Sequence, residues 1–325
     1  MISTRFSSSP LFRTAAVFAG AALLTGCAAG GPPAAAAPSS SESPAQAAST
    51  TSGGSRVARD DAATEKANLA VVTRLFSATF PDPDSAEARA TAAASVEKDA
   101  TVHGGNNASG PAGLLAQFAA AHKSASGAQA VIKRTAADGD LVAVHYQITA
   151  DPSDERTGEA AADVFRLAGG KIVERWAFAQ PIAQGPAASG NTNSMFSDLY
   201  DPATPSPAPT EAQEEKNRVF AVAAFDTLFK DQDASILDRA FDPNYLQHNP
   251  VAPNGTAALK SLFGGGAAFP PIESTVSLSD GDLVWTLSQA VGAKADDPYT
   301  ALDIFRVDGN LIREHWDVVP TTPAG

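Results

Sequence analysis

The feature that most constrains the fold is an internal repeat, which relates residues 62–185 to residues 211–320. Matching residues occur in the same order in both segments, and the offset between them changes only slowly along the chain. The matched pairs are Asn68 and Asn217, Phe76 and Phe225, His103 and His248, Asp138 and Asp280, Asp163 and Asp303, and Trp176 and Trp316. Ordered matches of this kind indicate duplication of one structural unit, so the chain is predicted to contain two copies of one small domain.

Each copy begins with an amphipathic helix whose apolar residues recur at helical spacing. These residues are Leu69, Val72, Phe76 and Phe80 in copy one, and Val219, Val222, Phe225, Leu228 and Phe229 in copy two. A shorter helix, an extended segment, a further helix (113–122 or 256–263) and several β-rich runs separated by Asp-Gly or Gly-Gly turns follow. The pattern predicts the α+β class: two cone-like α+β barrel domains, each with N-terminal helices packed on a curved antiparallel sheet.

Two segments outside the repeat have compositions that do not support a core. Residues 27–61 are mainly Ala, Ser, Pro, Gly and Thr without an apolar period, which predicts a disordered tether. Residues 186–210 are rich in proline and predict a semi-extended linker. The predicted domains are therefore residues 62–185 and residues 211–320.

The N-terminus has the features of an export signal. Arg5 and Arg13 give it positive charge, and an apolar run too short to span a bilayer follows. The sequence Leu-Thr-Gly-Cys ending at Cys27 resembles the bacterial lipobox, in which the cysteine is acylated and becomes the first mature residue. This resemblance implies a signal peptide of residues 1–26, a lipidated Cys27 and a membrane-anchored protein in the extracytoplasmic cell envelope. The alternative is an ordinary secretory signal that happens to contain a cysteine.

Charge and cysteine content exclude several classes of partner and site. The formal net charge is −13, and removal of a signal peptide with two arginines and no acid would make it −15. Such an acidic chain repels phosphate backbones, so no nucleic-acid partner is expected. One cysteine allows neither an intrachain disulfide nor a thiol-rich zinc cluster. The sequence also has no phosphate loop or nucleophile elbow, and we expect no metal and no cofactor.

The last hairpin of copy two places charged residues close together. A three-residue loop, in which Asn310 adopts a left-handed conformation, pairs Val307 with Leu311 and places Asp303 opposite His315. The same register in copy one sets a carboxylate opposite a base, Asp163 and Arg175, which favours it. A two-residue loop is disfavoured because it would pair Asp303 with another acid, Glu314.

Strand alternation predicts that Asp317 lies on the same face as Asp303 and His315, whereas Ile304, Glu314 and Trp316 point the other way. A histidine flanked by carboxylates can exchange protons near neutral pH. The alternative is an ion pair that only fixes the hairpin. A second polar cluster, from Tyr245 to Pro250, either lines a pocket or ends a strand in an Asn-Pro turn.

Together these motifs resemble the SnoaL-like polyketide cyclase family of the nuclear-transport-factor-two-like superfamily. The resemblance covers nearly all of each copy and rests on three runs, Tyr245-Leu246-Gln247-His248-Asn249-Pro250, Asp303-Ile304-Phe305-Arg306 and Glu314-His315-Trp316-Asp317. It implies a cone of helices and sheet around an apolar pocket, with cofactor-free aldol ring closure. By position, Asp317 would be the acid/base, whose pKa burial would raise, and His248 and His315 would assist it. Asp303 completes the catalytic cluster, and Tyr245 and Asn249 would bind the ligand.

Copy one departs from this pattern. It keeps His103, but Gly104-Gly105 replaces Asn249-Pro250, Arg175 replaces His315 and Ala177 replaces Asp317. We therefore expect copy one to be degenerate. The superfamily often dimerises through its sheets, so the two copies are expected to form a pseudo-dimer, and a homodimer is the other arrangement.

Three functions remain open from the sequence. The first is a lipoprotein whose second domain binds a small apolar or carbonyl-containing molecule and performs acid/base chemistry of the aldol, isomerase or dehydratase type. The second is a non-catalytic binder of an apolar ligand, and the third is an envelope scaffold. Fold alone does not decide among them. Export argues against a polyketide tailoring step, because those substrates are made inside the cell.

Overall fold

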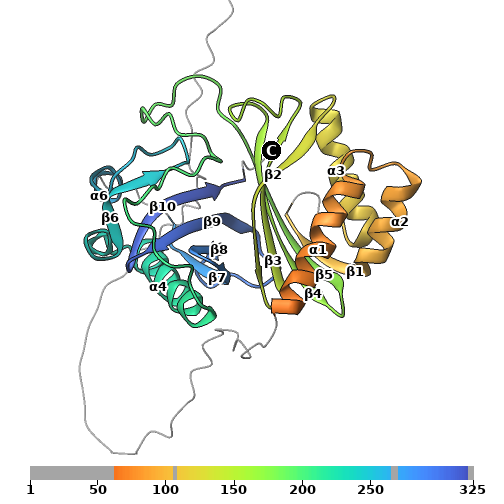
Figure 1. Ribbon diagram of the computed structural model, residues 1–325. Helices are drawn as coiled ribbons and strands as arrows, with labels where there is room; N and C mark the ends of the chain where they lie inside the picture. Colours follow the sequence, from red (N-terminus) through yellow and green to blue (C-terminus); the bar gives the residue numbers. More distant parts are fainter. Residues whose placement is uncertain (1–61, 105–107, 265–269, 321–325) are drawn as a thin grey trace, which may run out of the picture. The chain divides into compact units, whose positions relative to one another are not determined.

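The computed structural model describes residues 62–104, 108–264 and 270–320 (Figure 1). The predicted signal peptide (1–26), the lipidation site Cys27 and the tether (27–61) lie outside these residues. Among the residues described, none of the helices has the length and apolar character needed to cross a membrane.

The first half contains three helices and a five-stranded sheet in the order β1-β5-β4-β3-β2. Its elements are α1 (Ala62–Thr79), α2 (Ala86–Ser95), β1 (Val96–His103), α3 (Gly110–Ser124), β2 (Gln129–Asp138), β3 (Leu141–Thr149), β4 (Glu159–Ala168) and β5 (Lys171–Pro181). Neighbouring strands are antiparallel, except that β1 pairs with β5 in parallel.

The second half repeats this arrangement, with the sheet order β6-β10-β9-β8-β7. Its elements are α4 (Glu211–Phe229), the 3-10 turn η1 (Ala234–Ile236), α5 (Leu237–Ala240), β6 (Phe241–Gln247), α6 (Thr256–Gly264), β7 (Ile272–Asp280), β8 (Leu283–Ala290), β9 (Tyr299–Asp308) and β10 (Leu311–Val318). The predicted α+β class is confirmed. The sheets are antiparallel as expected except at one edge of each, where β1 pairs with β5 and β6 pairs with β10 in parallel. The chain leaves β1 and β6 through a helix rather than a hairpin, and such a crossover connection permits parallel pairing.

Each sheet buries one face under the helices of its own half (Figure 1). Phe76 of α1 packs with Phe118 and Phe165 in the first half, and Phe225 of α4 packs with Phe305 in the second. The helical periodicity predicted these contacts. It was wrong at Val219, which is 55% exposed, because the buried stripe of α4 runs through Asn217, Ala221, Ala224, Phe225 and Leu228.

The opposite faces of the two sheets pack against each other in a shared core. This core contains Trp176 and Phe178 from the first half and Trp285, Ile304 and Trp316 from the second. Because each copy buries apolar sheet surface on the other, the two halves form the pseudo-dimer that the repeat suggested.

Two reciprocal hydrogen bonds cross this interface at equivalent positions of the repeat. The backbone N–H of Ala137 donates to Asp280 Oδ2 at 2.9 Å, and the backbone N–H of Ser279 donates to Asp138 Oδ2 at 2.9 Å. An exchange of this kind, in which each copy gives the other the same contact, is the signature of a two-fold interface.

The register of the last hairpin differs from the predicted one. Asp308 pairs with Leu311, so the turn holds only Gly309 and Asn310, each with φ of 59°. Two consecutive left-handed residues make the type I′ turn that suits the twist of antiparallel strands. A bulge at Arg313 then shifts the pairing again.

The shifted register sets Asp317 directly opposite Asp303, whereas the predicted partner of Asp303 was His315. The turn and the bulge each move the pairing by one residue. Since side chains alternate with a period of two, the two shifts together leave the residues after the bulge, including His315, Trp316 and Asp317, on their predicted faces. The first half behaves in the same way, with Ala177 opposite Asp163 instead of Arg175.

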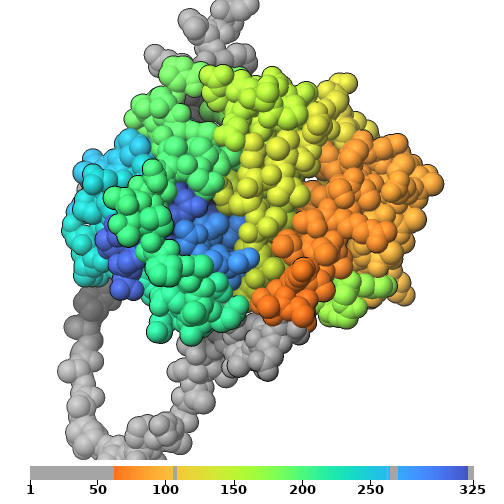
Figure 2. Space-filling model, in the orientation of Figure 1, coloured from red at the N-terminus to blue at the C-terminus, as the bar shows by residue number. Residues whose placement is uncertain are grey.

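Residues 182–210, which we call the connecting segment, contain neither helix nor strand but are built into the fold. Met195 and Phe196 belong to the shared core, and the Phe196 carbonyl accepts a hydrogen bond from Arg134 Nη2 at 2.6 Å. Figure 2 shows the green atoms of this segment against both the yellow atoms of the first half and the blue and cyan atoms of the second. The prolines and serines of the sequence predicted an extended linker, but they do not reveal this packing.

The interface bonds predict unequal losses of stability. We expect Asp138→Ala, which removes a buried charge-assisted acceptor, to lower the free energy of unfolding by about 2 kcal/mol, and Asp280→Ala to lower it by about 1 kcal/mol. Urea unfolding at pH 7 measures both. Asp296→Ala, at an exposed acid between β8 and β9, is the control and should change stability by less than about 0.5 kcal/mol. Equal values for all three variants would contradict a stabilising role for the reciprocal bonds.

Candidate functional site

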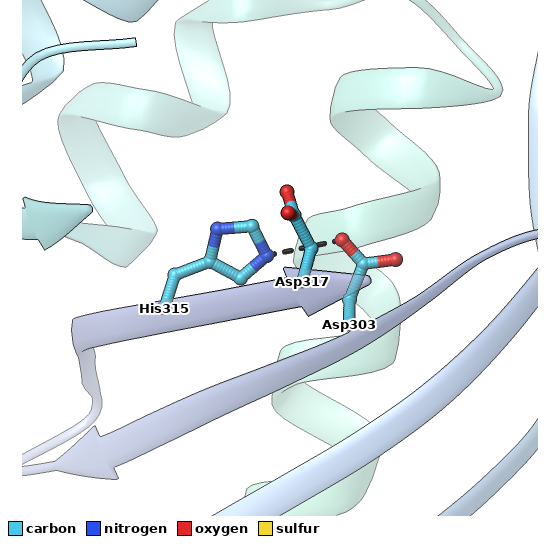
Figure 3. Close-up of side chains that lie close together, drawn as sticks. All are labelled: Asp303, His315 and Asp317. Atoms are coloured by element: carbon cyan, nitrogen blue, oxygen red, sulfur yellow. Dashed lines mark hydrogen bonds and ion pairs between the residues drawn. The ribbon is translucent and has the colours of Figure 1, made fainter. Parts of the chain in front are cut away.

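Three polar side chains meet on the helix-facing side of the second sheet (Figure 3). Asp303 comes from β9, and His315 and Asp317 come from β10. His315 Nε2 lies 3.0 Å from Asp303 Oδ1, and ligand-type atoms of all three residues lie within 4.8 Å of one another. The structure thus brings together the three residues that strand alternation predicted to share a face.

The imidazole of His315 is held at both nitrogens and stacks on an aromatic ring. Its Nδ1 is hydrogen-bonded to the Tyr245 hydroxyl at 2.9 Å, and Gln247 Nε2 donates to the same hydroxyl at 3.0 Å. The ring stacks on Phe305, with 4.7 Å between centroids and 11° between planes. Burial raises the pKa of Tyr245 well above 10.0, so its hydroxyl stays protonated.

Burial and charge oppose each other at His315. Burial disfavours the imidazolium, but the hydrogen bond to Asp303 and the charges of Asp317 and Asp303 outweigh it, so the pKa of His315 is raised above 6.5. The site therefore favours a positively charged imidazolium between two carboxylates.

Asp317 is the group whose charge changes near neutral pH. Burial raises the pKa of Asp317 from 3.8 to about 6. The charge of His315 lowers it, the charge of Asp303 directly across the strand pair raises it, and a hydrogen bond from Asn249 lowers it again. A carboxyl group with this pKa can both accept and return a proton at physiological pH.

Tyr245 and Asn249 contact the predicted catalytic residues directly, and their predicted role in ligand binding stays a prediction. Asn249 Oδ1 accepts from the backbone N–H of Val251 at 3.1 Å, which fixes the orientation of the carboxamide. Asn249 Nδ2 is thereby left to donate to Asp317 Oδ1. Tyr245 and Asn249 thus orient His315 and Asp317, respectively.

His248, predicted to assist Asp317, is not part of this cluster. Its Nε2 lies 2.7 Å from Glu314 Oε1, its Nδ1 lies 2.5 Å from the Ser194 carbonyl, and its ring stacks on Trp316 at 4.8 Å. Glu314 and Trp316 occupy the other face of the sheet, as alternation predicted. His248 therefore lies on the interface side of the sheet.

The first half repeats this position of the histidine. His103 stacks on Trp176 with 5.4 Å between centroids, and its Nε2 lies 2.9 Å from Glu174 Oε1. A histidine is thus placed alike in both copies, on the interface side of each sheet. The charge of His248 also lowers the pKa of Asp317, and the assistance predicted for His248 stays a prediction.

The equivalent site of the first half is a closed ion pair. Arg175 Nη2 donates to Asp163 Oδ2 at 2.7 Å, Arg175 also donates to Gln117 Oε1, and both charged groups are buried. Ala177 lies opposite Asp163, so the second acid is missing. Here a permanent cation neutralises the carboxylate, in contrast to the titratable groups of the second half.

The cluster in the second half also has the donor set of a metal site. One imidazole nitrogen and two carboxylates suit divalent transition ions. However, His315 Nε2 is already bonded to Asp303, and the other oxygen of Asp303 points away from His315 (Figure 3). The expectation of a metal-free site stays a prediction.

A surface hollow lies in the first half, away from this cluster. Its volume is about 360 Å³, and it is lined by Pro83, Asp84, Arg89, Pro111, Ala112, Leu115, Ala116 and Ala119 of the α2–α3 region. It holds no candidate acid/base pair of the kind described above. The ligand pocket predicted for the second half stays a prediction.

Sequence reasoning missed the residues that support the site from outside the second half. Gln180 of β5 and Asn191 of the connecting segment contact the turn that carries Asn249. No spacing motif links them to Asp317, because they belong to the other copy and to a stretch that resembles a linker. Only the packing of the two halves reveals them.

Comparisons with known proteins support the family resemblance for part of the chain. The family model of the SnoaL-like domain matches residues 62–175, so the first half is similar to that domain. The match falls on the degenerate copy, whereas the motifs that suggested the family lie in the second. A search of curated proteins found no match.

Solved structures with similar folds include three bacterial proteins. A SnoaL-like family protein from Agrobacterium tumefaciens is 16% identical, with 35% of this chain and 97% of that chain covered and a TM-score of 0.31. A SnoaL-like protein from Jannaschia sp. is 20% identical, with 40% and 100% covered and a TM-score of 0.32. An NTF-2 like protein from Burkholderia xenovorans is 15% identical, with 38% and 89% covered and a TM-score of 0.30. At these values the likenesses carry no inference about activity.

The raised pKa of Asp317 predicts a pH-dependent contribution to stability. Between pH 3.8 and about 6 the folded protein holds a proton on Asp317 that the unfolded chain has released. This contribution is fully present below pH 3.8 and is lost as the pH rises through 6. Asp317→Asn removes it, so the variant should gain stability relative to the wild type between pH 4 and pH 7.

Urea unfolding at several pH values measures this difference. Asp296→Asn, at an exposed acid, should differ from the wild type by a constant amount over the same range. A constant difference for Asp317→Asn as well would show that Asp317 titrates as an ordinary surface acid.

Proposed function

We propose that the second half binds a small carbonyl-containing molecule and transfers a proton at the carbon beside the carbonyl, without a cofactor. Reactions of the aldol, isomerase or dehydratase type share this step. The observation that carries the proposal is the placement of two acids directly opposite each other, one of which has a pKa of about 6 beside a fixed histidine. Opposed acids destabilise a strand pair, and perturbed groups of this kind cluster at functional sites.

In the proposed mechanism Asp317 acts first as a base and then as an acid. The ionised carboxylate takes a proton from the substrate carbon, whose electron pair moves toward the carbonyl oxygen to form an enolate. The protonated Asp317 then returns the proton to the enolate or to a leaving hydroxyl group. His315 is held beside Asp317 by Asp303 and Tyr245, and its raised pKa favours the positively charged form.

Solvent exchange tests this function without knowledge of the natural substrate. In D₂O, the protein should speed the incorporation of deuterium beside the carbonyl of some members of a panel of cyclic and aryl ketones, as followed by proton NMR. Asp317→Asn should slow this exchange by about 100-fold or more, because a positioned general base contributes at least that much. The pH profile should rise through about 6 as Asp317 ionises.

The control is Asp163→Asn, which changes the acid of the first half that corresponds to Asp303. Provided that its melting temperature shows a folded protein, it should exchange at the wild-type rate. Ketones that raise the melting temperature but show no exchange would contradict catalysis and favour a non-catalytic binder. If no ketone binds and no exchange occurs, both pocket functions are contradicted and the scaffold function is favoured.

We further propose that the chain is anchored to the membrane of the cell envelope through lipidated Cys27. The charged N-terminus, the short apolar run and the lipobox-like sequence support this. In a bacterial host fed an alkyne analogue of palmitate, the wild type should incorporate the label and fractionate with membranes. Cys27→Ser should abolish both. Equal labelling of the two proteins would contradict acylation at Cys27.

A further inference from the structure

We propose that the first half and the connecting segment complete the site of the second half, with Gln180 and Asn191 as positioning residues that hold Asn249 against Asp317. This inference rests on the proposed function of Asp317. It gives the degenerate copy a role, which is to supply part of the support for a site that the second copy does not build alone.

Asn249 lies in a turn that follows β6, outside any regular element. Its carboxamide is oriented by Val251, and its Nδ2 faces two acceptors, Asp317 Oδ1 and Gln180 Oε1, the latter at 3.5 Å. Within the second half, the backbone N–H of His248 donates to the His315 carbonyl at 3.0 Å, and that of Asn249 donates to Gln247 Oε1 at 2.9 Å. Further hydrogen bonds to the turn come from outside this half.

The connecting segment holds the backbone of this turn. Asn191 Nδ2 donates to the carbonyls of Gln247 at 2.8 Å and Ala252 at 2.9 Å, and lies 3.3 Å from the carbonyl of Asn249. Ser189 Oγ donates to the carbonyl of Pro250 at 2.7 Å. Buried carbonyls without a donor are costly, so the turn and the segment depend on each other.

Gln180 joins the turn to the end of β10. Its Oε1 accepts from the backbone N–H of Val319 at 3.0 Å, two residues beyond Asp317, and faces Asn249 Nδ2. A single carboxamide oxygen of the first half thus contacts both chain segments that carry the Asn249–Asp317 pair. The contact to Asn249 is at the outer limit of a hydrogen bond, and the contact to Val319 fixes the position of the oxygen.

The first half lacks the counterparts of both Asn249 and Asp317. Gly104 occupies the position of Asn249 and has φ of 89°, and a Cβ atom there would lie 2.3 Å from the carbonyl oxygen of Ala177. Ala177 in turn occupies the position of Asp317. The copy without the acid therefore has no room for the amide, which is consistent with a functional pair that is kept or lost as a unit.

The consequence concerns the charge of Asp317. A donor from Asn249 stabilises the ionised carboxylate against burial and against Asp303. If the turn moves away, Asp317 loses this donor and keeps its proton to a higher pH.

Carbon-13 NMR of the Asp317 carboxyl group in the full chain tests this inference directly. Asn249→Ala should raise the midpoint of the Asp317 titration by about 0.5 pH unit or more. Asn191→Ala and Gln180→Met, which do not touch Asp317, should raise it in the same direction by a part of that amount. If Asn191→Ala does not fold, Ser189→Ala takes its place, so the segment is still tested.

Tyr200→Phe is the matched control. It removes a hydrogen bond of the same connecting segment, from the Tyr200 hydroxyl to Asp308 at 2.6 Å, but does not touch the Asn249 turn. Its midpoint should equal that of the wild type.

The inference would be overturned if Asn249→Ala titrates with the wild-type midpoint. It would also be overturned if Gln180→Met and the connecting-segment variant (Asn191→Ala or Ser189→Ala) both do so. An equal shift of the Asp317 midpoint in Tyr200→Phe would also overturn the inference. The shift would then follow from any destabilisation of the connecting segment and not from loss of the contacts to the Asn249 turn. The readout is separate from turnover. Shifted midpoints in a protein that exchanges no ketone would contradict the proposed function while the positioning role stands.

Discussion

Trp176, Trp285 and Trp316 bury one face of each sheet against the other, and this packing decides what the remaining surfaces can do. Each sheet is left with one free face, which its own helices cover, so the interior of each half lies between helices and sheet. Polar groups on the interface side, such as His103 and His248, are committed to the packing of the two halves. Polar groups on the helix side, such as Asp317, remain available for chemistry.

The repeat and the side-chain periodicity of the sequence predicted most of this fold. Spacing alone predicted the order of helices and strands in each half. It also predicted that Glu314 and Trp316 lie on the opposite face of the sheet from His315 and Asp317. The strand register did not, because one glycine-containing turn can be read as two or three residues and a bulge leaves no mark in the sequence. The predicted faces of His315, Trp316 and Asp317 were right only because the turn and the bulge together shift the pairing by an even number of residues.

The site was predictable in its members but not in its geometry. The sequence reasoning rejected a register that placed two acids opposite each other, and such a pair, Asp303 and Asp317, is what the structure contains. Rules derived from stability are expected to fail at functional sites, which agrees with the function proposed for this pair. His248 matches a family motif, but the local backbone places it on the other side of the sheet, beside Glu314, and its assisting role stays a prediction.

The covalent link between the halves affects how their sequences can diverge and how their association depends on protein concentration. In a homodimer every substitution appears in both subunits, so neither subunit can give up its Asp317 while the other keeps it. A duplicated chain removes this symmetry, and Arg175 and Ala177 could arise beside an intact partner. The link also fixes the local concentration of each half around the other, so their association does not weaken when the protein is scarce. A support such as Asn191 can therefore stay in place at any abundance of the chain.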